Sequence, residues 1–189
     1  MYGRGVFGMR PYRIMWIRSI LIAATLVASL SALAGGTYQQ PEDFLMETFA
    51  GQPPPPQAVW LSGALRDEVE NLLGHRYPSL RIRYWAQETL SAWILEEVGK
   101  DLPITTGIVV RDGRIEQIKV LVFRESRGGE VRYPFFTDQF KNSKLQEDKQ
   151  LDHRIDNISG ATMSVRALVK QARLALLLHQ HVSKLHAAP

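Results

Sequence analysis

The hydrophobic and polar positions between residues 80 and 123 repeat with the two-residue period of β-strands. Residues 80–84 (LRIRY) alternate apolar and basic side chains, which is typical of a strand with one buried face. Residues 91–98 (SAWILEEV) fit neither the helical nor the strand period cleanly. A strand is favoured there, because residues 99–101 (GKD) then form a turn into the apolar segment 104–111 (ITTGIVVR).

A two-residue turn, Asp112 and Gly113, separates that segment from residues 114–123 (RIEQIKVLVF). Asp-Gly between two runs of this kind is the strongest short-range signal of a β-hairpin. The centre of the chain is therefore predicted to be an antiparallel meander of three or four strands.

Two helices are predicted outside the meander. A short helix covers residues 62–74, where Ser62 is a suitable N-cap and Gly74 suits the position after the last turn. A longer helix covers residues 162–181, and its apolar stripe is expected to pack across one face of the sheet. The stripe consists of Val165, Leu168, Val169, Ala172, Ala175 and Leu176. The expected fold class is α+β, with an antiparallel sheet packed against a long C-terminal helix and preceded by a short helix and a signal segment.

Residues 20–34 (ILIAATLVASLSALA) form an uncharged apolar segment that follows four arginines. As a helix it would be about 22 Å long, which is shorter than a membrane core of about 30 Å. With Ala32, Leu33 and Ala34 at its end, the segment is typical of a secretory signal cleaved after Ala34. An uncleaved anchor is the alternative, because residues 14–17 (IMWI) extend the apolar run. Either form delivers the rest of the chain outside the cytoplasm, so a periplasmic location is expected.

The residues after the signal segment are rich in proline up to residue 58. The run 53–56 (PPPP) lacks backbone donors and favours the extended polyproline conformation. A tether is favoured for this arm, and a proline-rich ligand for a partner is the alternative. The predicted organisation is thus a signal segment (residues 1–34), a proline-rich arm (35–58) and a folded domain (59–189).

The net charge of +4 comes entirely from the first 18 residues of the chain. Those residues hold four arginines and no acid, so residues 35–189 carry 19 positive and 19 negative charges. This balance argues against a nucleic-acid partner. The chain has no cysteine, which excludes iron–sulfur clusters, thiolate catalysis, c-type haem attachment and disulfides.

Residues 156–162 (DNISGAT) combine hydroxyl side chains and a glycine at the start of the predicted long helix. Gly160 lets the backbone bend and lets a bulky group approach. The free amides at the start of the helix form an anion site, for which a phosphate is the obvious guest. The alternative is purely structural: Ser159 or Thr162 caps the helix, and Gly160 makes the turn.

This segment resembles the D-x-x-[ST]-G-A-[ST] motif of covalently flavinylated FMN-binding domains. Such domains occur in a subunit of the sodium-pumping NADH–quinone reductase, in the Rnf complex and in small exported flavoproteins. The resemblance covers roughly residues 90–178, and residues 104–123 look like the family's central hairpin. Residues 124–129 (RESRGG) look like its E-[ST]-x-G-x-G loop with altered glycine spacing. Residues 140–142 (FKN) look like its F-x-G segment with Asn142 in place of glycine.

The resemblance implies that Thr162 is esterified to the phosphate of FMN by an FMN transferase that uses FAD. It also implies cofactor-binding roles for the motif turn, the helix start and the glutamate loop. These residues are Asp156, Ser159, Gly160, Ala161, Ser164, Glu125 and Ser126.

The implied function is that of an exported electron carrier or reductase subunit. It relays electrons between a membrane-bound cytochrome- or quinol-linked protein and an extracytoplasmic acceptor. Whether the protein is itself an enzyme stays open at this point. A different class of protein is the alternative: a non-redox binding module that uses the same helix N-terminus for a phosphorylated ligand or partner.

Four aromatic side chains are candidates to sandwich a flavin ring, although core or sheet-surface positions are their ordinary role. They are Trp85, Trp93, Phe135 and Phe136. His153 lies near the motif, where it is either a phosphate or flavin contact or a solvated loop side chain. His179 and His181 are two residues apart on a helix, so they point to different faces and make a poor metal pair.

Overall fold

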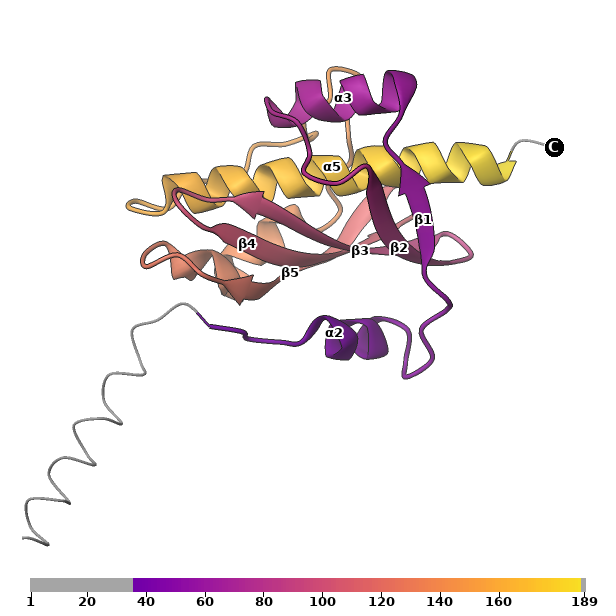
Figure 1. Ribbon diagram of the computed structural model, residues 1–189. Coiled ribbons are helices and arrows are strands. Elements are labelled where there is room, and N and C mark those ends of the chain that lie inside the picture. Colours follow the sequence, from indigo (N-terminus) through magenta and orange to yellow (C-terminus); the bar gives the residue numbers. More distant parts are fainter. Residues whose placement is uncertain (1–35, 188–189) are drawn as a thin grey trace, which may run out of the picture. The chain divides into compact units, whose positions relative to one another are not determined.

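The computed structural model describes residues 36–187, which form a five-stranded antiparallel sheet with helices on both of its faces (Figure 1). The strands pair in the order in which they occur along the chain, so the sheet is a simple meander. They are β1 (Gln57–Trp60), β2 (Arg81–Gln87), β3 (Leu90–Val98), β4 (Pro103–Arg111) and β5 (Arg114–Phe123). The α+β class and the strand at residues 91–98 are confirmed, whereas the expected three or four strands become five.

Within residues 36–187, four α-helices and two short 3₁₀ helices accompany the sheet. The α-helices are α2 (Pro41–Thr48), α3 (Gly63–Leu73), α4 (Pro134–Thr137) and α5 (Thr162–Ala187). The 3₁₀ helices are η2 (Gly129–Arg132) and η3 (Asp138–Phe140). None of the helices within residues 36–187 has the length and apolarity needed to cross a membrane. The predicted signal segment at residues 20–34 lies outside the described residues.

The β4–β5 hairpin has the turn that its sequence predicts. Asp112 and Gly113 both take positive φ angles, 51° and 72°. A two-residue turn of this kind matches the right-handed twist of the flanking strands. The hairpin therefore fixes the register of the two strands that lead into the candidate site.

Helix α5 lies across one face of the sheet and contacts β3 and β4, while α3 packs on the helix from the other side (Figure 1). Its predicted stripe is buried except for Val169, which is half-buried. Because α3 and the loop before α5 cover the rest of the helix, it is also buried at Ala167, Leu174 and Leu178. The helix starts at Thr162 as predicted and continues beyond His181 to Ala187.

Helix α2 covers the opposite face of the sheet, and it corrects the prediction of an extended arm. Pro41 lies in the first turn of α2, where its missing N–H costs nothing. The ring of Phe44 is fully buried against Gly107 of β4, where a Cβ atom would stand only 2.7 Å from that ring. Residues 53–56 do lack regular secondary structure, and the chain then enters β1 instead of remaining a tether.

The segment between β5 and α5 closes the open edge of the sheet at one point. Asn142 donates its backbone N–H to Ile115 of β5 at 2.8 Å, and Ile115 donates to the carbonyl of Ser143 at 2.9 Å. Asn142 takes a φ of 65°, a left-handed conformation that asparagine tolerates better than other non-glycine residues. An asparagine therefore serves at the position where the F-x-G segment ordinarily has glycine.

Candidate functional site

The motif 156–162 forms a tight turn that delivers Thr162 to the first position of α5. Gly160 has a φ of 82°, and Ala161 donates its N–H to the carbonyl of Ile158 at 2.9 Å. The side-chain amide of Asn157 reaches across the turn and donates a hydrogen bond of 2.9 Å to the Thr162 hydroxyl. The turn therefore holds the hydroxyl oxygen of Thr162 in a defined position at the helix start.

Helix capping does not account for the hydroxyl groups of this motif. Among the described residues, neither Ser159 nor Thr162 directs its side chain to a backbone amide of α5. Ser159 is exposed, and the Thr162 hydroxyl contacts Asn157 instead. The structural alternative, in which these residues only cap the helix, therefore has no hydrogen bond to support it.

The loop after β5 packs directly on the start of α5. Gly128 has a φ of 84°, and a Cβ atom there would stand 2.6 Å from the Ser164 hydroxyl and 3.3 Å from the Cβ of Ala161. Only glycine combines this conformation with so close an approach. Gly128 therefore holds residues 124–128 against the motif, although Gly128 and Ala161 lie 33 positions apart in the sequence.

Glu125 organises the turn between β3 and β4. Its side chain is 5% exposed, and its Oε1 atom accepts hydrogen bonds from the backbone amides of Lys100, Asp101 and Leu102 at 2.5–3.0 Å. Burial alone raises the pKa of Glu125, but the three amides outweigh burial and hold that pKa below its ordinary value. Glu125 is thus an ionised carboxylate that fixes the β3–β4 turn beside the helix start.

These three segments enclose a pocket of about 550 Å³, referred to below as the Thr162 pocket. Its lining consists of Lys100, Asp101, Glu125, Ser126, Arg127, Gly160, Ala161, Thr162, Met163 and Ser164. Six of the eight residues predicted from the sequence line this pocket, and Asp156 and Ser159 do not. Both of these side chains are exposed on the outer side of the motif turn.

Asp156 is held through its backbone and not through its carboxylate. Its N–H donates to the side-chain oxygen of Gln139 at 2.7 Å. His153 adds a second link, because its ring nitrogens lie 2.8 Å from the Gln139 carbonyl and 3.0 Å from the Asp152 carboxylate. The Gln139 carbonyl, with help from Asp152, raises the pKa of His153. His153 therefore braces the loop that leads into the motif and does not line the Thr162 pocket.

The aromatic candidates for a flavin sandwich do not line the Thr162 pocket. Trp93 is buried and stacks on Tyr84, with ring centroids 4.9 Å apart, and Phe136 packs edge-on against Phe140 in the core. Phe135 is exposed, and Trp85 is half-buried on β2. The ordinary interpretation of these residues as core or sheet surface is the one that the structure supports.

Six residues at or near the pocket are absent from the sequence-based list of binding residues. They are Lys100, Asp101, Arg127 and Met163, which line the pocket, and Asn157 and Gly128, which contact its residues. Asn157 and Arg127 stand at variable positions of the segments that resemble the family's motifs, and Gly128 stands at the first glycine of the glutamate loop. Lys100 carries no signal in the sequence, because only the Glu125 hydrogen bonds bring its turn to the helix start.

The pocket suits an anion with a hydroxyl nucleophile beside it. Arg127 and Lys100 supply two cations, although Lys100 also pairs with the Asp101 carboxylate at 3.7 Å, and the amides at the start of α5 add partial positive charge. The Glu125 carboxylate is already engaged by three amides, so it adds little repulsion at the pocket floor. A volume of about 550 Å³ lies within the usual range for small-molecule sites. The residues present therefore fit a phosphate-bearing cofactor.

Comparison with known families agrees with this chemistry. Residues 99–177 match the family model described as the FMN-binding domain. The matched segment starts at the β3–β4 turn and ends within α5, so it contains all the residues that line the Thr162 pocket. No curated protein and no solved structure matches the chain significantly.

Proposed function

We propose that this flavin-binding protein, whose residues 99–177 match the FMN-binding domain family, carries FMN covalently on Thr162. The observation that carries this proposal is the position of the Thr162 hydroxyl. It lies at the start of α5, is held by Asn157, and belongs to a residue that lines a pocket together with Lys100 and Arg127.

The attachment is a phosphoester formed from FAD by an FMN transferase. The new bond joins Thr162 Oγ1 to the phosphorus of FMN, while the pyrophosphate bond of FAD breaks and AMP leaves. The proton of the hydroxyl passes to a base on the transferase. The resulting phosphodiester keeps about one negative charge, which the amides at the start of α5 and the two cations neutralise.

Covalent attachment suits a protein that works outside the cytoplasm. A cofactor held at micromolar affinity, about 8 kcal/mol, is diluted away when no cytoplasmic pool replenishes it. The signal segment at residues 20–34 supports export, and a periplasmic location follows from it. A phosphoester to Thr162 retains the flavin in that compartment.

Flavin supplies one- and two-electron chemistry to the protein. The chain has no cysteine and no second cofactor motif, so electrons arrive from one protein and leave to another. We infer a relay between a membrane-bound cytochrome- or quinol-linked donor and an extracytoplasmic acceptor. The protein is an electron-transfer component on this proposal, and any oxidoreductase activity belongs to its complex.

Intact-mass spectrometry of the protein coexpressed with an FMN transferase tests the attachment. The expected mass increase is one FMN minus one water. Thr162→Val removes the hydroxyl with little change in shape and should abolish the increase, while Thr162→Ser should retain it. Ser183→Ala is the matched control, because Ser183 is exposed on the same helix, outside both the motif and the pocket, and should not affect the increase. An unmodified wild-type mass, obtained while another substrate of the same transferase is labelled, contradicts the proposal.

The same pocket supports a second candidate function. Two cations and a helix N-terminus also suit a free phosphorylated ligand, held by a non-redox binding module. A colourless protein that binds a phosphate compound, with affinity lowered by Arg127→Gln, would favour this candidate. Retention of the yellow chromophore after denaturation would exclude it.

A further inference from the structure

One end of the sheet face that α2 occupies is left uncovered. Helix α2 contacts β3 and β4, and the adjoining strands β1 and β2 extend beyond it. Residues opposite each other in an antiparallel pair share a face, and the pairs on this side are Trp60 with Arg81 and Ala58 with Arg83. On the other side of the same strands, the side chains of Val59 and Ile82 are buried in the core. The Trp60–Arg83 face, defined by Ala58, Trp60, Arg81, Arg83 and Trp85, is therefore solvent-exposed on one side of a well-packed sheet.

The composition of this face differs from that of an ordinary protein surface. Trp60 is 62% exposed, and the guanidinium of Arg81 lies 5.9 Å from the centre of its ring. Within residues 36–187, no carboxylate forms an ion pair with Arg81 or Arg83. Two guanidinium groups without a carboxylate partner thus lie beside one large exposed aromatic side chain.

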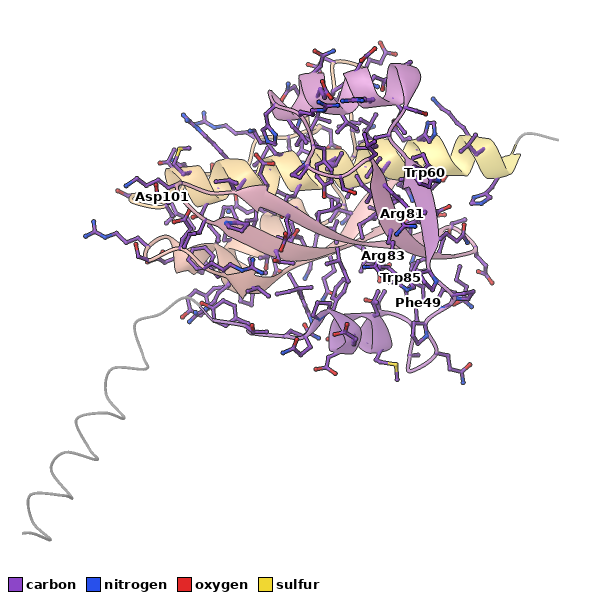
Figure 2. All side chains as sticks on the ribbon, in the orientation of Figure 1. Phe49, Trp60, Arg81, Arg83, Trp85 and Asp101 are labelled. Carbon is purple, nitrogen blue, oxygen red and sulfur yellow. The ribbon has the colours of Figure 1, made fainter. Side chains whose placement is uncertain are left out.

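A hollow beside this face is lined by both apolar and charged side chains, which suits an amphiphilic ligand. It measures about 360 Å³ and lies between the start of α2 and β2. Its apolar lining includes Leu45, Trp85 and Ile94, and its charged lining is Arg81, Arg83 and Glu42. Figure 2 shows Trp60, Arg81, Arg83 and Trp85 together at one end of the domain, and Asp101 of the Thr162 pocket at the other end of the view.

We propose that the Trp60–Arg83 face binds the surface of an anionic phospholipid bilayer. Arginine pairs bidentately with phosphate oxygens, and two unpaired guanidinium groups complement the headgroup charge. Tryptophan has an apolar body and a single N–H donor, so it prefers the boundary between headgroups and hydrocarbon. The hollow lined by Leu45 and Ile94 accepts the glycerol and upper acyl region of one lipid.

The absence of cysteine from the chain allows a site-specific test on the full-length protein. Ala58→Cys, labelled with an environment-sensitive fluorophore, places a probe on the face without altering Trp60, Arg81 or Arg83. Glu147→Cys, in an exposed loop outside the face, is the control position. The probes are phosphatidylcholine vesicles with and without phosphatidylglycerol. Any insertion of residues 20–34 is common to all variants, so differences between them report on the face.

The label at position 58 should brighten with phosphatidylglycerol vesicles, and the label at 147 should not. Arg81→Gln/Arg83→Gln should weaken the response about thirtyfold, since each arginine near an anionic surface contributes roughly fivefold. Arg111→Gln/Arg114→Gln removes the same charge elsewhere and should leave the response unchanged. Should the double arginine variant prove unstable, Trp60→Ser changes an exposed side chain and should also weaken binding.

Three results would overturn the proposal. The first is an equal response to vesicles with and without phosphatidylglycerol, and the second is a full response in Arg81→Gln/Arg83→Gln. The third is brightening of the Ala58→Cys label by soluble poly-glutamate but not by vesicles, which would assign the face to an acidic protein partner.

Discussion

The side-chain amide of Asn157 donates a hydrogen bond to the hydroxyl oxygen of Thr162, and the two atoms are 2.9 Å apart. The two residues are five positions apart in the sequence, and the tight turn at Gly160 brings their side chains together. Because Asn157 donates, the hydroxyl acts as acceptor and its own proton remains free to leave. This arrangement orients the oxygen without blocking it, which is what a nucleophile at the end of a rigid helix requires.

Asn157→Ala should slow flavin attachment at Thr162. The loss of one orienting hydrogen bond, about 1 kcal/mol, corresponds to about a fivefold slower reaction. The measurement is the time course of the mass increase with purified transferase and FAD. Ser183→Ala is the control and should react at the wild-type rate, since its exposed side chain lies outside the motif and the pocket. Equal rates for Asn157→Ala and wild type would show that Asn157 does not position the hydroxyl.

Glu125→Gln should destabilise the fold by about 2 kcal/mol, because three amides lose a charged acceptor in a buried site. The pKa of Glu125 is lowered from 4.5, so its contribution to stability is present above that value and is lost as the pH falls through the folded-state pKa. Urea unfolding between pH 7 and pH 3 measures both effects. The wild-type protein should lose more stability on acidification than Glu125→Gln does. Parallel stability profiles would mean that the Lys100–Leu102 turn does not depend on the carboxylate charge.

His179 should make the fold less stable at acidic pH. Its Nε2 accepts the N–H of Gly113 at 3.2 Å, so neutral His179 carries its proton on Nδ1 and donates it to Ser91 at 2.8 Å. Burial lowers the pKa of His179 from 6.5, with Asp112 opposing the shift. The neutral form is therefore favoured in the folded state, and stability falls as the pH drops below about 6.5. His179→Gln should remove this slope.

The measurement requires a background without His75. The pKa of His75 is raised by the Arg76 carbonyl and by Glu97, so His75 stabilises the fold below about 6.5 and loses that effect as the pH rises. Its effect runs opposite to that of His179. Urea titrations between pH 5 and pH 8 should therefore compare His75→Gln with His75→Gln/His179→Gln. An unchanged slope between these two proteins would contradict the role given to His179.

Gly107→Ala should detach α2 from the sheet. The new methyl group would stand 2.7 Å from the Phe44 ring, and both groups are fixed in a packed interface. We expect a loss of about 1–3 kcal/mol in unfolding free energy, with faster amide exchange in α2 than in α5. Phe44→Leu in combination with Gly107→Ala should recover part of the loss. Gly36→Ala is the control, because the nearest atom to its Cβ would be 3.9 Å away.

Local signals account for the parts of the fold that the sequence predicts correctly. Residues close together in the sequence determine both the turn at Asp112 and Gly113 and the apolar stripe of α5. The structure contains both as predicted. Helix α2 escapes prediction because the proline-rich composition of the segment favours an extended arm, whereas Pro41 lies in the first turn of the helix. The helix is also short, and the space that its Phe44 ring occupies exists because Gly107, on a distant strand, has no side chain there.

The candidate site likewise has one part that the sequence predicts and another part that it does not. The motif around Thr162 and the glutamate loop are visible in the sequence because they are contiguous. Contacts between distant segments determine the rest of the site. Gly128 packs on Ser164, and the hydrogen bond from Lys100 to Glu125 places Lys100 beside the helix start. The aromatic candidates take the ordinary role that the sequence favours for them, and Trp93 and Phe136 lie in the core.

The 26 residues of α5 separate its first residue, Thr162, from its last by about 39 Å. Residues 183–186, near the end of the helix, are exposed, so an affinity handle attached at that end lies away from the buried part of α5. Immobilising the protein on an electrode through that end would direct the Thr162 pocket toward the solution. Direct electrochemistry of the immobilised protein thus becomes a practical way to read the potential of a flavin carried there.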